Sequence, residues 1–238
     1  MEEDNDDKEA IPLDDVPEPG PLAPTLEMSN TLSDVNEAVT QLQKAIQQVR
    51  GWMAELHEWE LLEPAAGDVL AFAHRHEPGL FRVAGRLRTP AAMVIAKLKD
   101  HSQETRTLWD TDVERVECLA SYGDNMERVR SVVRMPFKLA PVTIEGIQHT
   151  TFTEQGSGGI GTYFYIFASS PPSAGDAHLI TGVTVRELDK QTGCEINAVF
   201  QCEWDTHWSV AWLIDPMLQS HFFNAERMVQ RALLYGEK

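Results

Sequence analysis

Three glycines and two histidines have spacings that could support cofactor or metal binding. Gly156, Gly158 and Gly161 form a GxGxxG pattern, which in dinucleotide-binding proteins opens a helix directly after a strand. Here the pattern joins two segments that both have the composition of strands, so we interpret it as a hairpin loop. His74 and His76 alternate along a predicted strand, but no third ligand joins them at a suitable spacing. The sequence therefore predicts neither a cofactor nor a metal site.

The sequence also contains few residues that could take part in catalysis. The chain has no GxSxG nucleophile elbow, which argues against a serine hydrolase. Glu145, His149 and His221 are the titratable residues that could act as general acids or bases in a pocket, and none has an evident partner. We therefore expect a binding protein without covalent chemistry and keep an enzyme as the alternative.

The segments that would position these residues are mostly strands. Alternating or β-branched composition predicts about eight of them, at 68–75, 80–88, 113–121, 126–134, 142–153, 162–169, 178–188 and 194–204. In the last strand, the even-numbered residues from Cys194 to Trp204 are apolar and the odd-numbered ones are mostly polar. One face of the sheet is therefore expected to be buried against apolar groups, and the other is expected to be wet, that is, exposed to solvent.

Two helices accompany these strands. Thr89 is expected to cap a short helix that opens on Pro90, and Asp215 and Pro216 open a long C-terminal helix that Gly236 closes. A strand meander followed by a long final helix implies an α+β, helix-grip fold. We predict a curved antiparallel sheet of about eight to nine strands, wrapped round the C-terminal helix and enclosing a mainly apolar cavity.

The N-terminal part of the chain has a different composition. Residues 1–30 carry ten acidic residues, one lysine, five prolines and no aromatic residue. Such a segment cannot bury enough apolar surface to offset the entropy of ordering, so residues 1–31 are predicted to be a disordered acidic tail. Apolar residues then recur at steps of three and four, which predicts a long amphipathic helix over 32–58. This helix packs on its own domain or, alternatively, forms a coiled-coil dimer.

Overall composition excludes several classes of partner. The formal net charge of −17 counts against nucleic-acid binding and against electrostatic docking on anionic lipid. The longest uncharged run, Gln155–Gly175, contains GSGGIG and two adjacent prolines, so no transmembrane helix fits it. Cys118, Cys194 and Cys202 show no CxxC spacing and are expected to be reduced. We predict a cytoplasmic protein whose contact with membranes is transient and apolar.

Four segments of the chain match, in order, the elements of one known domain. GLFRVAGRLRTPAAMVIAKLKD resembles its second strand and following helix, and RTLWD resembles its Trp-Asp signature. NMERVRSVVRMPFKLAP resembles the strand that leads into its Pro-Phe turn, and FQCEWDTHWSVAWLIDPMLQSHFFNAERMV resembles its last strand and gating helix. By these segments the chain resembles the START (steroidogenic acute regulatory protein-related lipid transfer) domain, and the resemblance covers the predicted domain, residues 59–238.

The resemblance implies that this domain binds one sterol, phospholipid, sphingolipid or acyl lipid in its cavity and transfers or senses it. A gate is expected from the C-terminal helix and the loop Glu154–Gly161, which contains Gly156, Gly158, Gly159 and Gly161. Ligand contacts are expected from Arg106, Trp109, Glu145, Gln148, His149, Tyr163, Tyr165, Phe167, Phe200, Cys202, Trp204, Met217, His221, Phe222, Ala225 and Val229.

Some alternatives stay open within this resemblance. Arg106 matches an arginine that phospholipid-binding members place near the lipid phosphate, but it could instead form a structural ion pair with Asp110 or Glu104. The aromatic residues among the expected contacts could be ordinary core. Related helix-grip folds act as aromatase/cyclase or hydrolase enzymes, and a dimeric scaffold built on residues 32–58 is a third possibility.

Overall fold

The computed structural model describes residues 32–62, 69–102, 106, 110, 113–123, 125–134, 141–155, 160–169, 177–189 and 193–204. These residues form two helices and nine strands: α1 (Leu32–Ala54), β1 (Trp59–Leu61), β2 (Val69–His74), β3 (Leu80–Leu87), α2 (Ala91–Leu98), β4 (Val113–Ser121), β5 (Met126–Val133), β6 (Val142–Gln155), β7 (Ile160–Ser169), β8 (Ala177–Asp189) and β9 (Gly193–Trp204). The predicted acidic tail and C-terminal helix lie outside the described residues.

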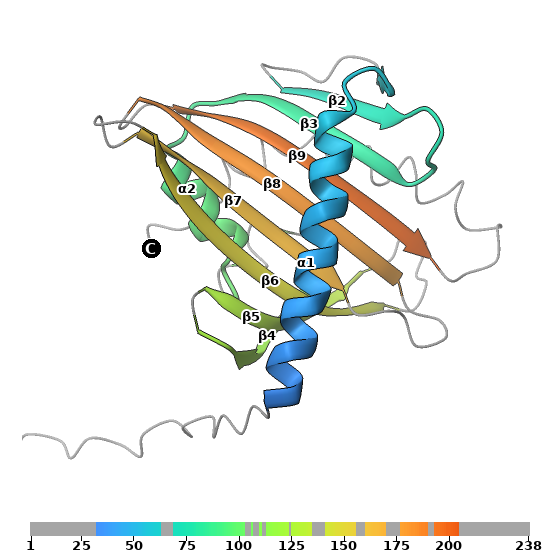
Figure 1. Cartoon of the computed structure of the whole chain (residues 1–238), viewed down its shortest axis with the longest axis vertical. Helices are drawn as coiled ribbons and strands as arrows, with labels where there is room; N and C mark the ends of the chain where they lie inside the picture. Colours follow the sequence, from blue (N-terminus) through green and yellow to red (C-terminus); the bar gives the residue numbers. More distant parts are fainter. Residues whose placement is uncertain are drawn as a thin grey trace, which may run out of the picture.

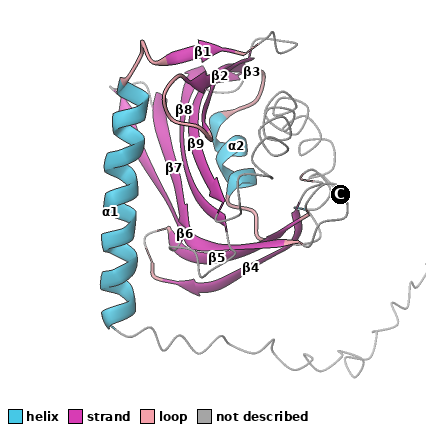
Figure 2. Cartoon of the chain, turned by 90° about the vertical axis from the view of Figure 1, so that its right-hand side faces the viewer, coloured by secondary structure: helices cyan, strands magenta, loops and turns pink. Residues whose placement is uncertain are grey.

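All nine described strands belong to one antiparallel sheet. The order is β1-β2-β3-β9-β8-β7-β6-β5-β4, so consecutive strands are neighbours except where β9 pairs with β3. The sheet is strongly curved, with α1 lying across its convex face and α2 in its hollow (Figures 1 and 2). The expected α+β architecture with a curved antiparallel sheet is thus confirmed.

The observed elements differ in detail from the predicted ones. β1 was not predicted, because a strand of three residues has too little alternation to be recognised. The short helix α2 has Pro90 as its N-cap and no side-chain hydrogen bond there, so the prediction that Thr89 caps it was wrong. β6 continues to Gln155 and β7 begins at Ile160. The connecting loop is therefore shorter than the expected Glu154–Gly161.

The convex face of the sheet is covered by α1. The apolar stripe of this helix, which includes Ala38, Leu42, Ala45 and Val49, packs against buried residues of β6, β7, β8 and β9. The fit is close at Gly182 of β8, where an added Cβ would come within 2.2 Å of a Val49 methyl group. Because this stripe is buried against the sheet, a coiled-coil dimer through the same stripe would require α1 to leave its place.

Helix α1 also explains why the prediction of one wet sheet face was wrong. Along β9, Glu195 and Asn197 face a groove on the convex side, but Val199 is fully buried and Gln201 is 9% exposed. Gln48 of α1 donates a hydrogen bond to the Gln201 side chain at 3.2 Å. Strand alternation was correct, but it does not reveal that a distant helix covers half of the polar side.

Candidate functional site

The concave face of the sheet is lined mainly by apolar side chains. Alternate residues of β3, β7, β8 and β9 point into the hollow and pack with Ala91, Val94 and Ile95 of α2. Within this cluster the rings of Phe81 and Phe200 stack with their centroids 5.8 Å apart. A buried face of this kind suits an apolar ligand or an apolar core equally well.

One row of residues across this face changes from polar to aromatic. Cross-strand pairing aligns, from β5 to β3, the side chains of Glu127, Gln148, Phe167, Thr181, Phe200 and Phe81. Five steps between neighbouring strands, at about 4.8 Å each, give the row a length of about 24 Å along the sheet. The hollow therefore has a polar end over β5 and β6 and an apolar end over β9 and β3.

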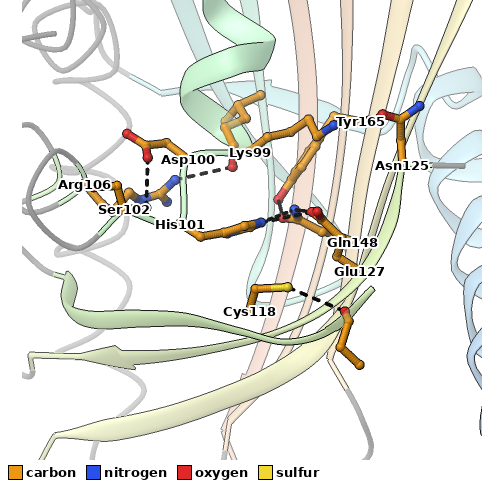
Figure 3. A network of polar contacts seen from close by, with 12 residues as sticks. Lys99, Asp100, His101, Ser102, Arg106, Cys118, Asn125, Glu127, Gln148 and Tyr165 are labelled. Carbon is orange, nitrogen blue, oxygen red and sulfur yellow. Dashed lines mark hydrogen bonds and ion pairs between the residues drawn. The ribbon is translucent and has the colours of Figure 1, made fainter. Parts of the chain in front are cut away.

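Four side chains, which we call the polar cluster, occupy the polar end: His101, Glu127, Gln148 and Tyr165 (Figure 3). Gln148 Nε2 lies 2.7 Å from Glu127 Oε2 and 2.8 Å from His101 Nε2. His101 Nε2 is also 3.0 Å from Glu127 Oε2, and the Tyr165 hydroxyl donates to Gln148 Oε1 at 3.3 Å. The cluster joins β5, β6, β7 and the segment after α2.

Burial and hydrogen bonding shift the pKa of two members of the polar cluster in different ways. Burial raises the pKa of the Tyr165 hydroxyl to about 12, so this group stays protonated and available as a donor. At Glu127, burial works to raise the pKa, but the hydrogen bonds with His101 and Gln148 outweigh it and the pKa is lowered. The polar end of the hollow therefore holds a carboxylate at neutral pH.

Arg106 is held by protein groups beside the polar cluster. Its guanidinium forms an ion pair with the buried Asp110 at 3.0 Å. Its Nη1 atom also lies 3.3 Å from the carbonyl oxygen of Lys97 and 3.4 Å from that of Leu98, at the end of α2. The alternative of a structural ion pair with Asp110 thus describes Arg106 in this structure, and the same contacts complete the last turn of α2.

Several of the other expected ligand contacts share the concave face. Tyr163, Phe167, Phe200 and Cys202 all lie in or against its apolar cluster, as Tyr165 does. Gly161 belongs to β7 and not to the loop, and an added Cβ there would come within 2.2 Å of the Phe152 ring. Trp204 ends β9, and its side chain is outside the described residues, as are Trp109, Met217, His221, Phe222, Ala225, Val229, Gly156, Gly158 and Gly159.

Glu145 and His149 do not join these residues. Both alternate with the inward-facing Gln148 along β6, so they lie on the convex side of the sheet. Glu145 accepts a hydrogen bond from Arg130 at 2.9 Å there. Expecting them in the pocket was wrong, because the prediction took residues from one strand without separating its two faces.

His101 and Glu127 were missed from the sequence. Glu127 stands opposite Gln148 in the β5–β6 register, so a correct strand alignment would have found it. His101 follows α2 in an irregular segment, and no sequence pattern marks it.

The described residues contain neither a candidate metal site nor a helix that could span a membrane. No group of three His, Cys, Asp or Glu side chains in this part of the chain could hold a metal ion. His74 Nδ1 accepts hydrogen bonds from the backbone N–H groups of His76 and Glu77, which fixes the turn after β2. Among the described helices, neither is long and apolar enough to cross a membrane.

The curved nine-stranded sheet, with one helix outside and one in the hollow, has the START-domain fold. Human StAR-related lipid transfer protein 5 matches it with a TM-score of 0.67 at 15% identity, over 85% of this chain and 99% of that protein. Human STARD10 matches with a TM-score of 0.60 at 18% identity, over 80% of each chain. The lipid transfer and protein localization domain of human StarD13 matches with a TM-score of 0.55 at 12% identity, over 78% of this chain and 95% of that domain.

Sequence comparison adds no relative to these structures. No protein-family model and no curated protein sequence matches the chain. At 12–18% identity, the structural likeness shows the fold.

Proposed function

We propose that this protein binds one hydrophobic molecule with a polar end in the hollow of its sheet, and transfers or senses it. The observation that carries the proposal is the row from Glu127 to Phe81, which is polar at one end and aromatic at the other. Two of the similar structures are named as a lipid transfer protein and a lipid transfer domain, which supports a lipid as the ligand.

In this proposal the ligand lies along the row. Its apolar part contacts Phe167, Phe200 and Phe81, and its polar end reaches the polar cluster. Each large apolar side chain that the ligand covers contributes about 1.5–3 kcal/mol of hydrophobic stabilisation at most. The polar end is bound by hydrogen bonds, since a buried polar group without a partner would cost about 1–3 kcal/mol.

The polar cluster favours an uncharged polar end with an O–H or N–H group. Glu127 supplies a carboxylate that accepts such a hydrogen, and it would repel a phosphate. Arg106, one of the nearby cations that could compensate a phosphate, is paired with Asp110 and bound to two backbone carbonyls. We therefore place hydroxyl- or amide-bearing lipids ahead of phospholipids.

The gate is proposed to be the C-terminal helix, with Met217, His221, Phe222, Ala225 and Val229, together with the loop 156–159. A predicted helix that pairs with no strand could lift without breaking the sheet. A disulfide engineered between helix and loop should then block ligand uptake until it is reduced. Uptake by the locked protein at the unlocked rate would place the entrance elsewhere. We further propose that membrane contact is transient and that the protein works in the cytoplasm.

The test is to incubate the full chain with a lipid extract, re-purify it and identify the bound molecules by mass spectrometry. A stoichiometric lipid with an uncharged polar end is expected. Absence of any bound lipid over repeated extracts would contradict the proposal.

A second candidate is a helix-grip enzyme, favoured by the 3.0 Å contact between His101 and Glu127 in the hollow. The same mass spectrometry separates the two functions. Recovery of a chemically altered lipid would support an enzyme, and recovery of an unchanged one supports a binding protein.

A further inference from the structure

The convex face of the sheet carries an open groove beside α1, opposite the hollow. Its volume is about 790 Å³, and its walls come from β2, β3, β7, β8 and β9. The residues that line it include Leu70, Arg82, Arg86, Thr184, Arg186 and Glu195. We call it the arginine groove. It takes no part in the proposed lipid site, because the sheet separates the two.

The arginine groove is positive although the chain is strongly acidic. Among the described residues, three arginines and one glutamate line it, which gives a local excess of two positive charges against a net charge of −17 for the whole chain. Glu195 is shared by Arg86 and Arg186, whose side chains are 68% and 52% exposed. Arg82 Nε donates to the neutral Asn197 side chain at 2.9 Å. The groove can therefore accept further carboxylates.

We propose that the arginine groove docks the acidic N-terminal segment, residues 1–31, of the same chain. This segment has the complementary charge, since residues 1–30 contain ten acidic residues and one lysine. Hydrogen bonds between a carboxylate and a guanidinium group are charge-assisted and can be bidentate, which makes them among the strongest that side chains form. Among the described residues, Thr162, Thr184 and Asn197 also line the groove, and their side chains would add neutral hydrogen-bond partners.

The length of the segment allows this docking. Helix α1 begins beside β4, β5 and β6 and runs toward β2 and β3 (Figure 1), so a segment docked in the groove would have to double back along it. The 23 residues of α1 span about 35 Å, whereas 31 residues reach about 100 Å when extended and average about 30 Å as a flexible coil. Because the segment is tethered, its effective concentration at the groove is on the order of millimolar, so weak charge pairs suffice.

Photo-crosslinking in the full-length chain tests the proposal. The photoreactive residue p-benzoylphenylalanine replaces Thr184 in the groove, and crosslinked peptides are identified by mass spectrometry. We expect crosslinks to residues 1–30 whose yield falls at least about fivefold in 1 M salt, where the screening length is about 3 Å. The same probe at Thr143, which is exposed on β6 outside the groove, should give a yield that depends neither on salt nor on the charge of the groove.

Charge variants separate docking from a general effect of charge. R86E combined with R186E should lower the crosslinking yield to the level found in high salt. R115E is the matched control, because Arg115 is 61% exposed and pairs with Glu117 on β4, away from the groove. E195Q acts in the opposite direction and should raise the yield, since Glu195 is the only carboxylate that lines the groove within the part of the chain that the structure describes.

Crosslinks that miss residues 1–30, or that persist unchanged in R86E/R186E and in high salt, would overturn the proposal. Circular dichroism checks that each variant is folded. If the double variant is not folded, the crosslinking yield of E195Q tests the proposal, and a yield that does not rise overturns it. Binding of the full chain to phosphatidylserine vesicles, lost in R86E/R186E without any crosslink to the segment, would identify a membrane-contacting surface and also overturn it.

Discussion

The contact between Gly182 and Val49 makes the docking of α1 on the sheet measurable. In Gly182→Ala, the new Cβ would lie 2.2 Å and 2.9 Å from the two methyl groups of Val49, which is fully buried. Either α1 or β8 must shift, and overpacking of this kind costs about 1–3 kcal/mol. Val49→Ala alone removes both methyl groups and leaves a cavity, at a cost of about 2 kcal/mol.

The double variant G182A/V49A should be more stable than the sum of the two losses predicts. It leaves the two Cβ atoms 3.1 Å apart, which a small shift relieves, and the new methyl group fills part of the space left by Val49. We expect a coupling of about 1–2 kcal/mol in free energies of unfolding measured by urea titration. Additive losses would refute the close approach of α1 and β8.

Gly161→Ala is the matched control for Gly182→Ala. It introduces the same methyl group on a strand, also within 2.2 Å of a neighbour, but that neighbour is the ring of Phe152. The Phe152 side chain is half exposed and can rotate away. The loss should therefore stay below about 1 kcal/mol. A loss equal to that of G182A would show that proximity alone, and not the rigidity of the neighbour, decides the cost.

Two further predictions concern the polar cluster. The pKa of Glu127 is lowered in the folded protein, so its ionisation stabilises the fold above the ordinary glutamate range, and this contribution is lost as pH falls through the folded pKa. Urea titrations at pH 7 and pH 3.5 should show that the stability difference between wild type and E127Q shrinks on acidification, and a constant difference would contradict the ionised state. Y165F removes the hydroxyl that donates to Gln148 and should weaken retention of a hydroxyl-bearing lipid about fivefold, equivalent to about 1 kcal/mol. Y163F is its control, and equal losses in a fluorescent-lipid displacement assay would contradict a role for the polar cluster.

The strands were predictable because burial on a sheet imposes a period of two on the sequence. The same period does not say what covers each face. Gln201 was expected in water with the other polar residues of β9. It is buried under α1, as is Val199 on the same face, although α1 comes from more than a hundred residues earlier in the chain. Long-range packing of this kind leaves no local signal, although the apolar stripe of α1 did indicate that it needed a partner surface.

The candidate site was predictable for the same reason and to the same extent. Tyr165 and Phe200 were found because aromatic residues on strands need an apolar environment. Glu145 and His149 were misplaced by one position on β6, which is enough to put a side chain on the other face. The polar cluster also depends on register between β5 and β6 and on an irregular segment after α2, neither of which periodicity specifies.

The pairing of β3 with β9 means that the two ends of the hollow are assembled by different kinds of folding event. Glu127, Gln148 and Tyr165 of the polar end belong to β5, β6 and β7, which follow one another as hairpins, so this part can form from local contacts. The aromatic end needs Phe81 beside Phe200, and the neighbouring residues Arg82 and Asn197 are separated by 115 positions. Closing so long a loop is entropically costly and slow. A chain arrested before this closure would already present hydrogen-bonding groups yet lack the surface that holds an apolar tail, so ligand retention reports on completion of the last strand pair.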